Sequence, residues 1–193
     1  GIPLTHREYN SAVVFLTGHL CEQNAGMEID WAAMAAVKTL VIYMGVKNLP
    51  YIRERLLTHG MAADTPVALV RWGTLREQQT LVGELATIDR QAMEAKFSAP
   101  AIIVIGEVVR LRDALDWYES KPLFGLTVAV AASDPLEQGE NLAAVLESLG
   151  ADVLPVPVAV QTALADDDAL GLTDELERCR WLVFGDERQA GFF

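Results

Sequence analysis

The sequence predicts an α/β fold, and two observations point to it. Four short apolar runs rich in β-branched residues are typical of mostly buried strands, and they lie at 12–17, 39–44, 67–70 and 101–105. Segments with helical spacing alternate with them, at 31–37, 49–59 and 86–96. Strands that alternate with helices indicate a sheet whose faces are mostly covered.

Capping signals support the helices. Asp30 is placed to cap the first of them, and Asn48 is placed to cap the second. Pro50 suits the first turn of that second helix, and Gly60 is placed to end it. A further strand at 80–85 precedes the third helix. These signals predict where the elements begin and end.

Each of the four core strands runs into a glycine, namely Gly18, Gly45, Gly73 and Gly106. In open α/β sheets, ligands bind beyond the carboxyl ends of the strands, where glycine lets a ligand approach the backbone. The same glycines also suit tight turns, and both interpretations stay open. None of them belongs to a phosphate-binding loop, because neither glycine-rich consensus is present.

A second unit follows an irregular stretch at 119–125, which we interpret as a linker. Beyond it we expect a strand at 126–131, a helix from Ser133 to Gly150 and a strand at 151–158. A helix near 173–178 and a strand at 181–184 continue the alternation. We therefore predict a first domain at 1–118 and a partial α/β domain at 126–193. Because the chain begins with Gly and stops before such a fold closes, we expect it to be a piece of a longer protein.

Charge and composition narrow the partners. The 193 residues are 51% apolar and carry 15 basic and 27 acidic side chains, a net charge of −12. This balance disfavours nucleic acid, and no apolar run is long enough to cross a membrane. The acidity is uneven, since residues 119–193 carry 4 basic and 14 acidic groups. Two distant cysteines, Cys21 and Cys179, predict reduced thiols in a cytoplasmic protein and no metal site.

Several strings in residues 1–118 resemble one family. They are GIPLTHR at 1–7, FLTGH at 15–19, TLVIYMG at 39–45, TPVALV at 65–70 and PAIIVIGEVV at 100–109. In this order they are similar to the C-terminal half of the uroporphyrinogen-III C-methyltransferases. The fold class implied is the C-terminal α/β subdomain of a tetrapyrrole methylase. The family transfers methyl groups from S-adenosylmethionine to a tetrapyrrole, on the route to sirohaem and cobalamin, and S-adenosylhomocysteine is the product.

The resemblance implies roles for five residues. Met44 matches a methionine that contacts the cofactor, and Gly73 matches a glycine whose backbone lies near it. Pro100 and Ala101 are further candidates for the cofactor pocket. Arg7 matches an arginine that handles substrate, and we predict it as the catalytic candidate. The family also implies an N-terminal half not present in this sequence, which forms the other side of the cofactor site, and a homodimer.

The second unit resembles the beginning of the uroporphyrinogen-III synthases. KPLFGLTV at 121–128, LGADV at 149–153 and WLVF at 181–184 carry this resemblance, which implies a partial doubly wound α/β domain. Ala131 and Ala132 stand where that family has Thr-Arg, and residues 185–188 replace its Thr-Ser-x-Asn stretch. Because groups that bind carboxylates are lost, we expect this domain to lack synthase activity.

Substrate binding is an open question for so acidic a chain, because the tetrapyrrole carries many carboxylates. Arg7 with His6 is one candidate cluster, and Arg71 with Arg76 beside Gly73 is another. Alternatively, these two arginines lie on a solvated face and pair with Glu77. His19 either faces the cleft or is structural, and His59 suits a helix C-terminus.

Three functions fit the sequence. The first is a C-methyltransferase fused to a degenerate synthase-like domain. The second is a non-catalytic interaction or dimerisation module derived from these domains. The third is methylation of a later corrin precursor, which the string at 1–7 disfavours. A measurement of cofactor binding would distinguish the first function, which requires it, from the second, which does not.

Overall fold

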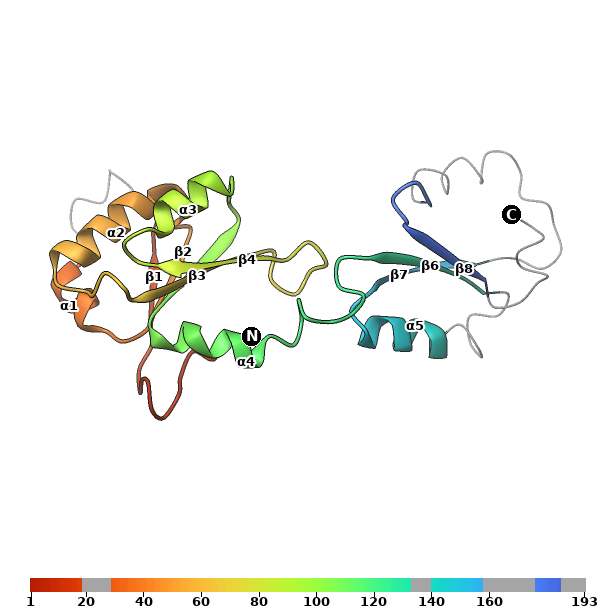
Figure 1. Ribbon diagram of the computed structural model, residues 1–193, viewed down its shortest axis with the longest axis horizontal. Coiled ribbons are helices and arrows are strands. Elements are labelled where there is room, and N and C mark those ends of the chain that lie inside the picture. The colour runs from red at the N-terminus through yellow and green to blue at the C-terminus, as the bar shows by residue number, and fades with distance from the viewer. Residues whose placement is uncertain (19–28, 133–139, 158–175, 185–193) are drawn as a thin grey trace. The chain divides into compact units, whose positions relative to one another are not determined.

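The computed structural model describes residues 1–18, 29–132, 140–157 and 176–184. The chain divides into two compact units, Gly1–Asp116 and Trp117–Phe193. The first unit contains a five-stranded mixed sheet with helices, and the second contains a three-stranded parallel sheet (Figure 1). The stretch at 119–125 belongs to the second unit, where Leu123 packs into the core and its N–H donates to Leu149 O at 3.0 Å. The stretch that we interpret as a linker thus packs against the second unit.

The strands of the first unit lie close to their predicted positions. They are β1 (Val14–Thr17), β2 (Leu40–Tyr43), β3 (Pro66–Arg71), β4 (Gln79–Glu84) and β5 (Ala101–Ile105). The helices are α1 (Trp31–Ala36), η1 (Val46–Asn48), α2 (Leu49–Thr58), α3 (Ile88–Glu94), η2 (Glu107–Leu111) and α4 (Arg112–Leu115). The sequence analysis did not anticipate η1, η2 or α4, which are short and lack a repeated apolar period.

The sheet order is β1-β2-β5-β3-β4, and only β1 and β2 run parallel to each other as neighbours. The pairings β2–β5, β5–β3 and β3–β4 are antiparallel, so the sheet of this unit is mixed. The loop between β3 and β4 is too short for a parallel crossover, which needs a dozen or more residues. As a result, β1, β2 and β3 have their carboxyl ends at the same end of the sheet, whereas β5 begins there.

One face of this sheet carries the main core. Buried side chains of α1, α2 and α3 pack there against alternate residues of the strands, among them Leu40, Ile42, Leu69, Ile103 and Ile105. The alternation follows from the two-residue period of a strand. The opposite face has a smaller core, in which Ala68 and Val104 meet η2 and the N-terminal segment. The sheet is therefore covered by helices on one face and only partly covered on the other.

Two of the capping predictions are confirmed and one is wrong. The Asp30 carboxylate accepts a 3.0 Å hydrogen bond from Ala33 N–H, and Gly60 follows α2 with a φ of 96°. Asn48 does not cap α2 with its side chain. Instead its Nδ2 donates to Gly18 O at 2.6 Å and ties the end of β1 to the start of α2. A tertiary contact has replaced the local one.

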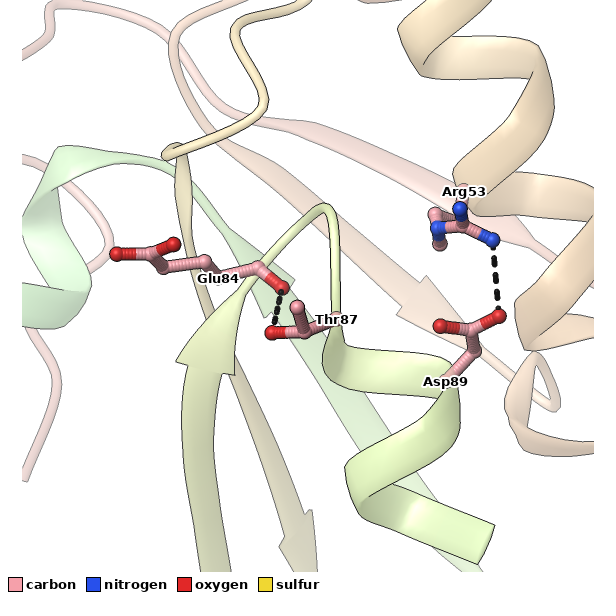
Figure 2. Close-up of polar contacts among 4 residues, drawn as sticks. All are labelled: Arg53, Glu84, Thr87 and Asp89. Carbon is pink, nitrogen blue, oxygen red and sulfur yellow. Dashed lines mark hydrogen bonds and ion pairs between the residues drawn. The ribbon is translucent and has the colours of Figure 1, made fainter.

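Figure 2 shows how α2 and α3 are joined on the helical face. Arg53 of α2 and Asp89 of α3 form an ion pair at 2.9 Å, with both side chains partly shielded. The hydroxyl of Thr87 lies 3.5 Å from Glu84 O, at the turn from β4 into α3. The ion pair holds α3 against α2, and the Thr87 contact holds the turn that leads from β4 into α3.

The second unit has the predicted strand order in the chain. It contains β6 (Thr127–Ala132), α5 (Glu140–Ser148), β7 (Asp152–Pro157) and β8 (Trp181–Phe184), and its sheet order is β7-β6-β8. All its strands are parallel. The start of the predicted helix at Ser133 and most of the one near 173–178 lie outside the described residues. The predicted order of strand, helix and strand between residues 126 and 158 is thus found here.

Candidate functional site

A hollow of about 620 Å³ opens at the end of the sheet where β2 and β3 end and β5 begins. Its lining residues come from three segments, namely 43–44 with 46–47, 70 with 72–73, and 99–102, and Lys47 is the one charged residue among them. Ligand pockets of this size and apolar character commonly hold a small molecule. The antiparallel β5 is what brings residues 99–102 to this edge.

The floor of the hollow is a row across three strands. Tyr43 of β2 is paired with Ile102 of β5, and Ile102 is paired with Val70 of β3. These residues alternate with Ile42, Ile103 and Leu69 of the main core, so they belong to the opposite, less covered face. Tyr43 remains 45% exposed, and its ring stacks on Phe15 with a centroid distance of 6.3 Å. An apolar surface is thus presented at the edge of the sheet.

Met44 projects from this edge instead of packing in the core. Its side chain is 65% exposed and it lines the hollow. Its φ of 54° lies in the left-handed region, which a non-glycine residue adopts at a cost of about 1–2 kcal/mol. A core methionine is therefore excluded, and backbone strain holds the thioether at the hollow.

The loop after β3 forms another wall of the hollow, through Trp72 and Gly73. Trp72 has a φ of 49°. The loop is held by hydrogen bonds from Leu75 N–H to Trp72 O at 3.0 Å and from Thr74 N–H to Gln78 Oε1 at 2.7 Å. A Cβ at Gly73 would meet only ordinary contacts, the nearest at 3.7 Å from Val70. The fold does not demand glycine at this position.

The other three glycines are structural. A Cβ at Gly18 would lie 2.3 Å from the Cα of Gly45, and one at Gly45 would lie 2.8 Å from Ile103. Gly106 lies at the opposite end of the sheet with a φ of 137°, and a Cβ there would lie 2.2 Å from Lys38 O. The expectation that all four glycines share one ligand edge is therefore wrong, because β5 runs in the reverse direction.

All four cofactor candidates from the sequence meet at the hollow: Met44, Gly73, Pro100 and Ala101. Arg7 does not line it. Arg7 is exposed in the turn between His6 and Asn10, and Asn10 Nδ2 donates to the Thr39 hydroxyl at 2.8 Å. Thr39 immediately precedes β2, so this turn is anchored at the end of the strand opposite to Met44.

The arginines beside Gly73 differ in their partners. Arg76 and Glu77 form an ion pair at 2.6 Å, and the hydrogen bond from Arg76 holds the pKa of the Glu77 carboxyl below its usual value. Arg71 has no such carboxylate among the described residues, and its guanidinium lies 3.7 Å from the Trp72 ring centroid. The solvated ion pair expected for both arginines is found for Arg76 alone.

None of the histidines and cysteines in the described part of the chain lines the hollow. His59 ends α2, and its Nδ1 lies 2.7 Å from Arg55 O, as expected for a residue at a helix C-terminus. His19, Cys21 and the acidic run at 166–168 lie outside the described residues. Within the described ranges, no three His, Cys, Asp or Glu side chains are grouped to hold a metal ion, and no helix there is long and apolar enough to span a membrane.

Sequence reasoning missed Trp72, Lys47 and Val46 as lining residues. Trp72 directly precedes Gly73, so its position next to a predicted site residue was a usable signal. Lys47 and Val46 follow Met44 closely, but the η1 turn that brings them back to the hollow has no clear sequence pattern.

Comparison with known proteins identifies the sequence type of the first unit. Residues 1–89 match the Tetrapyrrole (Corrin/Porphyrin) Methylases. This stretch of the chain is therefore similar to the tetrapyrrole methylases. The siroheme synthase of Thiobacillus denitrificans is 46% identical over 144 residues, covering 74% of this chain and 29% of the relative. The uroporphyrinogen-III C-methyltransferase of Bacillus subtilis is 39% identical over 158 residues, covering 81% of this chain and 32% of the relative. The uroporphyrinogen-III C-methyltransferase of Synechocystis sp. is 53% identical over 109 residues, covering 56% of this chain and 41% of the relative.

Two features of these matches matter for function. The chain spans between 29% and 41% of the length of these three relatives. The Bacillus subtilis match covers 81% of this chain, which is more than the first unit contains, so it extends into the second unit.

One solved structure shares the fold. A cobalt precorrin-4 methyltransferase, described as a cobalamin biosynthetic enzyme, matches with a TM-score of 0.50 at 17% identity and covers 56% of this chain and 45% of that chain. The mixed α/β fold is thus that of a tetrapyrrole methyltransferase. A uroporphyrin-III C-methyltransferase from Thermus thermophilus, complexed with S-adenyl homocysteine, is 29% identical with a TM-score of 0.47, covering 57% of this chain and 48% of that chain.

Proposed function

We propose that the first unit forms one wall of the S-adenosylmethionine site of a uroporphyrinogen-III C-methyltransferase. The observation that carries this proposal is the meeting of Met44, Gly73, Pro100 and Ala101 in one hollow. Their cofactor roles came from the family resemblance alone, without knowledge of the fold. Because they come from three separate segments, their convergence was not required by the sequence order. The tetrapyrrole methylase match over residues 1–89 is in keeping with it.

The residues at the hollow fit such a cofactor. The exposed Met44 thioether and the floor of Tyr43, Ile102 and Val70 offer an apolar surface to an adenosine group. Gly73 lets a ligand approach the backbone of its loop, because no side chain stands there. The cofactor supplies a methyl group already activated on a sulfonium sulfur.

The protein's part in methyl transfer is alignment and exclusion of water. Met44 and the Gly73 loop hold the donor, while Pro100 and Ala101 limit where it can move. One wall leaves the donor open to solvent, as the exposure of Met44 and Tyr43 indicates. We propose that a further part of the whole protein supplies the facing wall, in keeping with the share of its relatives that this chain spans. We also propose a homodimer as the assembly of the whole protein, and a cytoplasmic location, which the cysteine pattern predicts.

The substrate we propose is uroporphyrinogen III, with precorrin-2 as the product. Arg7 stands away from the hollow, so we assign it to the substrate and not to the donor. A large macrocycle with carboxylates around its rim allows such distant contacts. Arg7→Gln is expected to raise the KM for the tetrapyrrole and to leave the affinity for S-adenosylhomocysteine within about twofold.

Calorimetric titration of the full-length protein with S-adenosylhomocysteine tests the cofactor proposal. Gly73→Trp is expected to weaken binding at least about 100-fold, because the indole would occupy the hollow. Gly73→Ala is the matched control, since its Cβ meets only ordinary contacts and the fold accepts it. Unchanged binding by Gly73→Trp, with an unchanged melting temperature, would refute the assignment of the hollow.

For the second unit we propose a uroporphyrinogen-III synthase-like domain without synthase activity. The parallel β7-β6-β8 sheet and the extension of the Bacillus subtilis match into this unit support the proposal. Ala131 is buried near the carboxyl end of β6, and its methyl group cannot bind a carboxylate. The alternative, a non-catalytic interaction module, agrees with the same features.

The activity of this unit is tested by supplying hydroxymethylbilane to the full-length protein and separating the product isomers. The proposal predicts only the uroporphyrinogen I that forms spontaneously. Accumulation of uroporphyrinogen III above a protein-free blank would contradict it.

A further inference from the structure

Arg71 occupies a special position at the edge of the hollow. It ends β3 and lies between Val70 and Trp72, both of which line the hollow. Its backbone is fixed by pairing with Gln79 of β4 and with Ala101 of β5, and Ala101 is also a lining residue. The guanidinium lies over the Trp72 ring, with Cζ 3.7 Å from the ring centroid. Arg71 itself is not among the residues that line the hollow, so its charge lies next to the wall that Trp72 forms.

The charge of Arg71 has no anion to balance it within the described part of the chain. Most arginines of the first unit differ in this respect. Short ion pairs of 2.6–2.9 Å join Arg53 to Asp89, Arg76 to Glu77, Arg110 to Glu107 and Arg112 to Asp116. The acid nearest to Arg71 in the chain, Glu77, is already held by Arg76, whose hydrogen bond lowers the pKa of that carboxyl. Arg71 is therefore a half-buried cation with an aromatic partner and no carboxylate.

The Nε–H of Arg71 is buried and has no hydrogen-bond acceptor. Arg53 also has a buried Nε without an acceptor, but its Nη1 donates to Asp89 at 2.9 Å. Buried donors are usually satisfied by protein, water or a ligand, because shielding them without an acceptor costs free energy. Both arginines thus keep a buried Nε without an acceptor, and they differ in that Arg71 has no carboxylate partner among the described residues.

We propose that Arg71, held on the Trp72 ring, binds a carboxylate of the molecule that occupies the hollow. Stacking uses the face of the guanidinium and leaves its edge N–H groups for a planar acceptor, which a carboxylate matches with two parallel hydrogen bonds. This inference rests on the proposed methyltransferase function. Under that function, two sources supply the carboxylate: the amino-acid portion of the cofactor and the acidic side chains of the tetrapyrrole.

The test compares Arg71→Met and Arg71→Lys with the wild type in the full-length protein. Dissociation constants are measured for S-adenosylhomocysteine, for 5′-methylthioadenosine, which lacks the carboxylate, and for uroporphyrin III, by calorimetry and fluorescence. Arg71→Met is expected to raise the dissociation constant of one of the carboxylate-bearing ligands about tenfold or more. Arg71→Lys keeps the charge but not the fork and is expected to fall in between, so it separates a binding role from a purely structural one. Arg110→Gln is the control, because Arg110 already pairs with Glu107 at the opposite end of the sheet.

The ligand whose affinity falls in the Arg71 variants identifies the source of the carboxylate. Loss of S-adenosylhomocysteine affinity with unchanged methylthioadenosine affinity assigns it to the cofactor. Loss of uroporphyrin affinity alone assigns it to the tetrapyrrole. Equal losses for S-adenosylhomocysteine and methylthioadenosine, or changes under twofold for every ligand, would overturn the inference.

The two proposals fail in different ways. If the wild type bound no S-adenosylhomocysteine while its uroporphyrin binding still depended on Arg71, the methyltransferase function would be wrong and the carboxylate site would stand. If the wild type bound neither ligand, both would be overturned. Melting temperatures of both Arg71 variants within about 2 °C of the wild type show that a loss of binding is not a loss of fold.

Discussion

The two ends of the five-stranded sheet are built for different purposes. At one end, Asn10 and Thr39 are buried and hydrogen-bonded, and Gly106 passes close to Lys38 O. At the other end, Met44 and Trp72 have left-handed backbones and a large apolar side chain is left exposed. Side chains and backbone are thus tightly packed and hydrogen-bonded at the first end of the sheet, whereas apolar side chains remain exposed at the second. Strain and exposed apolar surface commonly gather at functional sites, so the comparison separates residues that hold the fold from residues available to a ligand.

Gly106→Ala is expected to have the largest effect on stability. The added Cβ would collide with Lys38 O, and the φ of 137° is unfavourable for any L side chain. We expect a loss of about 3 kcal/mol or more in the free energy of unfolding, measured by denaturant titration. Gly73→Ala at the other end is expected to change it by less than about 0.5 kcal/mol. Equal losses for both variants would remove the distinction between the two ends.

Asn10→Ala is expected to cost about 2–3 kcal/mol of stability, because it removes a hub of buried hydrogen bonds. The Nδ2 group donates to Leu4 O at 2.7 Å and to the Thr39 hydroxyl at 2.8 Å, and Oδ1 accepts from His6 N–H at 2.8 Å. Thermal and denaturant unfolding measure the change. Glu8→Ala, an exposed change in the same turn, is the control and is expected to be neutral. Similar stability of the two variants would show that this end is not closed as described.

Met44→Gly is expected to act in opposite directions on stability and on binding. Glycine relieves the left-handed strain and loses little packing, so stability is expected to rise by about 1 kcal/mol. The affinity for S-adenosylhomocysteine is expected to fall about tenfold, because the thioether contact is lost. Met93→Gly is the control for an exposed methionine: it lies on α3, 73% exposed, and is expected to lower stability without changing affinity. A loss of stability in Met44→Gly with unchanged affinity would indicate a packing role.

Lys47→Gln is expected to have the smallest effect. Lys47 is exposed at the hollow, so removing its charge is expected to weaken anionic ligands by about twofold to fivefold. Titrations at low and high salt measure it, and the difference between variant and wild type is expected to shrink as salt screens the charge. A difference that grows with salt would contradict an electrostatic role.

The sequence predicted the elements better than their pairing. β5 has its predicted bounds, Ala101–Ile105, and the Asp30 cap forms as expected, because both depend on local properties. The antiparallel direction of β5 depends on long-range pairing, which a run of apolar residues does not encode. For the same reason Asn48, a suitable cap by its type, donates to Gly18 O instead.

The candidate site was predictable where a motif named the residue. Met44 and Gly73 came from strings that resemble the family, and the structure adds that they share a hollow. The stacked Arg71 was not separable from Arg76 in the sequence, because both flank the same glycine. In the structure, the ion pair between Arg76 and Glu77 and the stacking of Arg71 on Trp72 distinguish them.

A crystal structure of the full-length protein with S-adenosylhomocysteine tests the central claim most directly. The account predicts electron density for the adenosine in the hollow, in contact with the Met44 side chain and the Gly73 backbone. Density for the ligand at any other place, with the hollow at residues 43–47, 70–73 and 99–102 filled by protein or solvent, would contradict it.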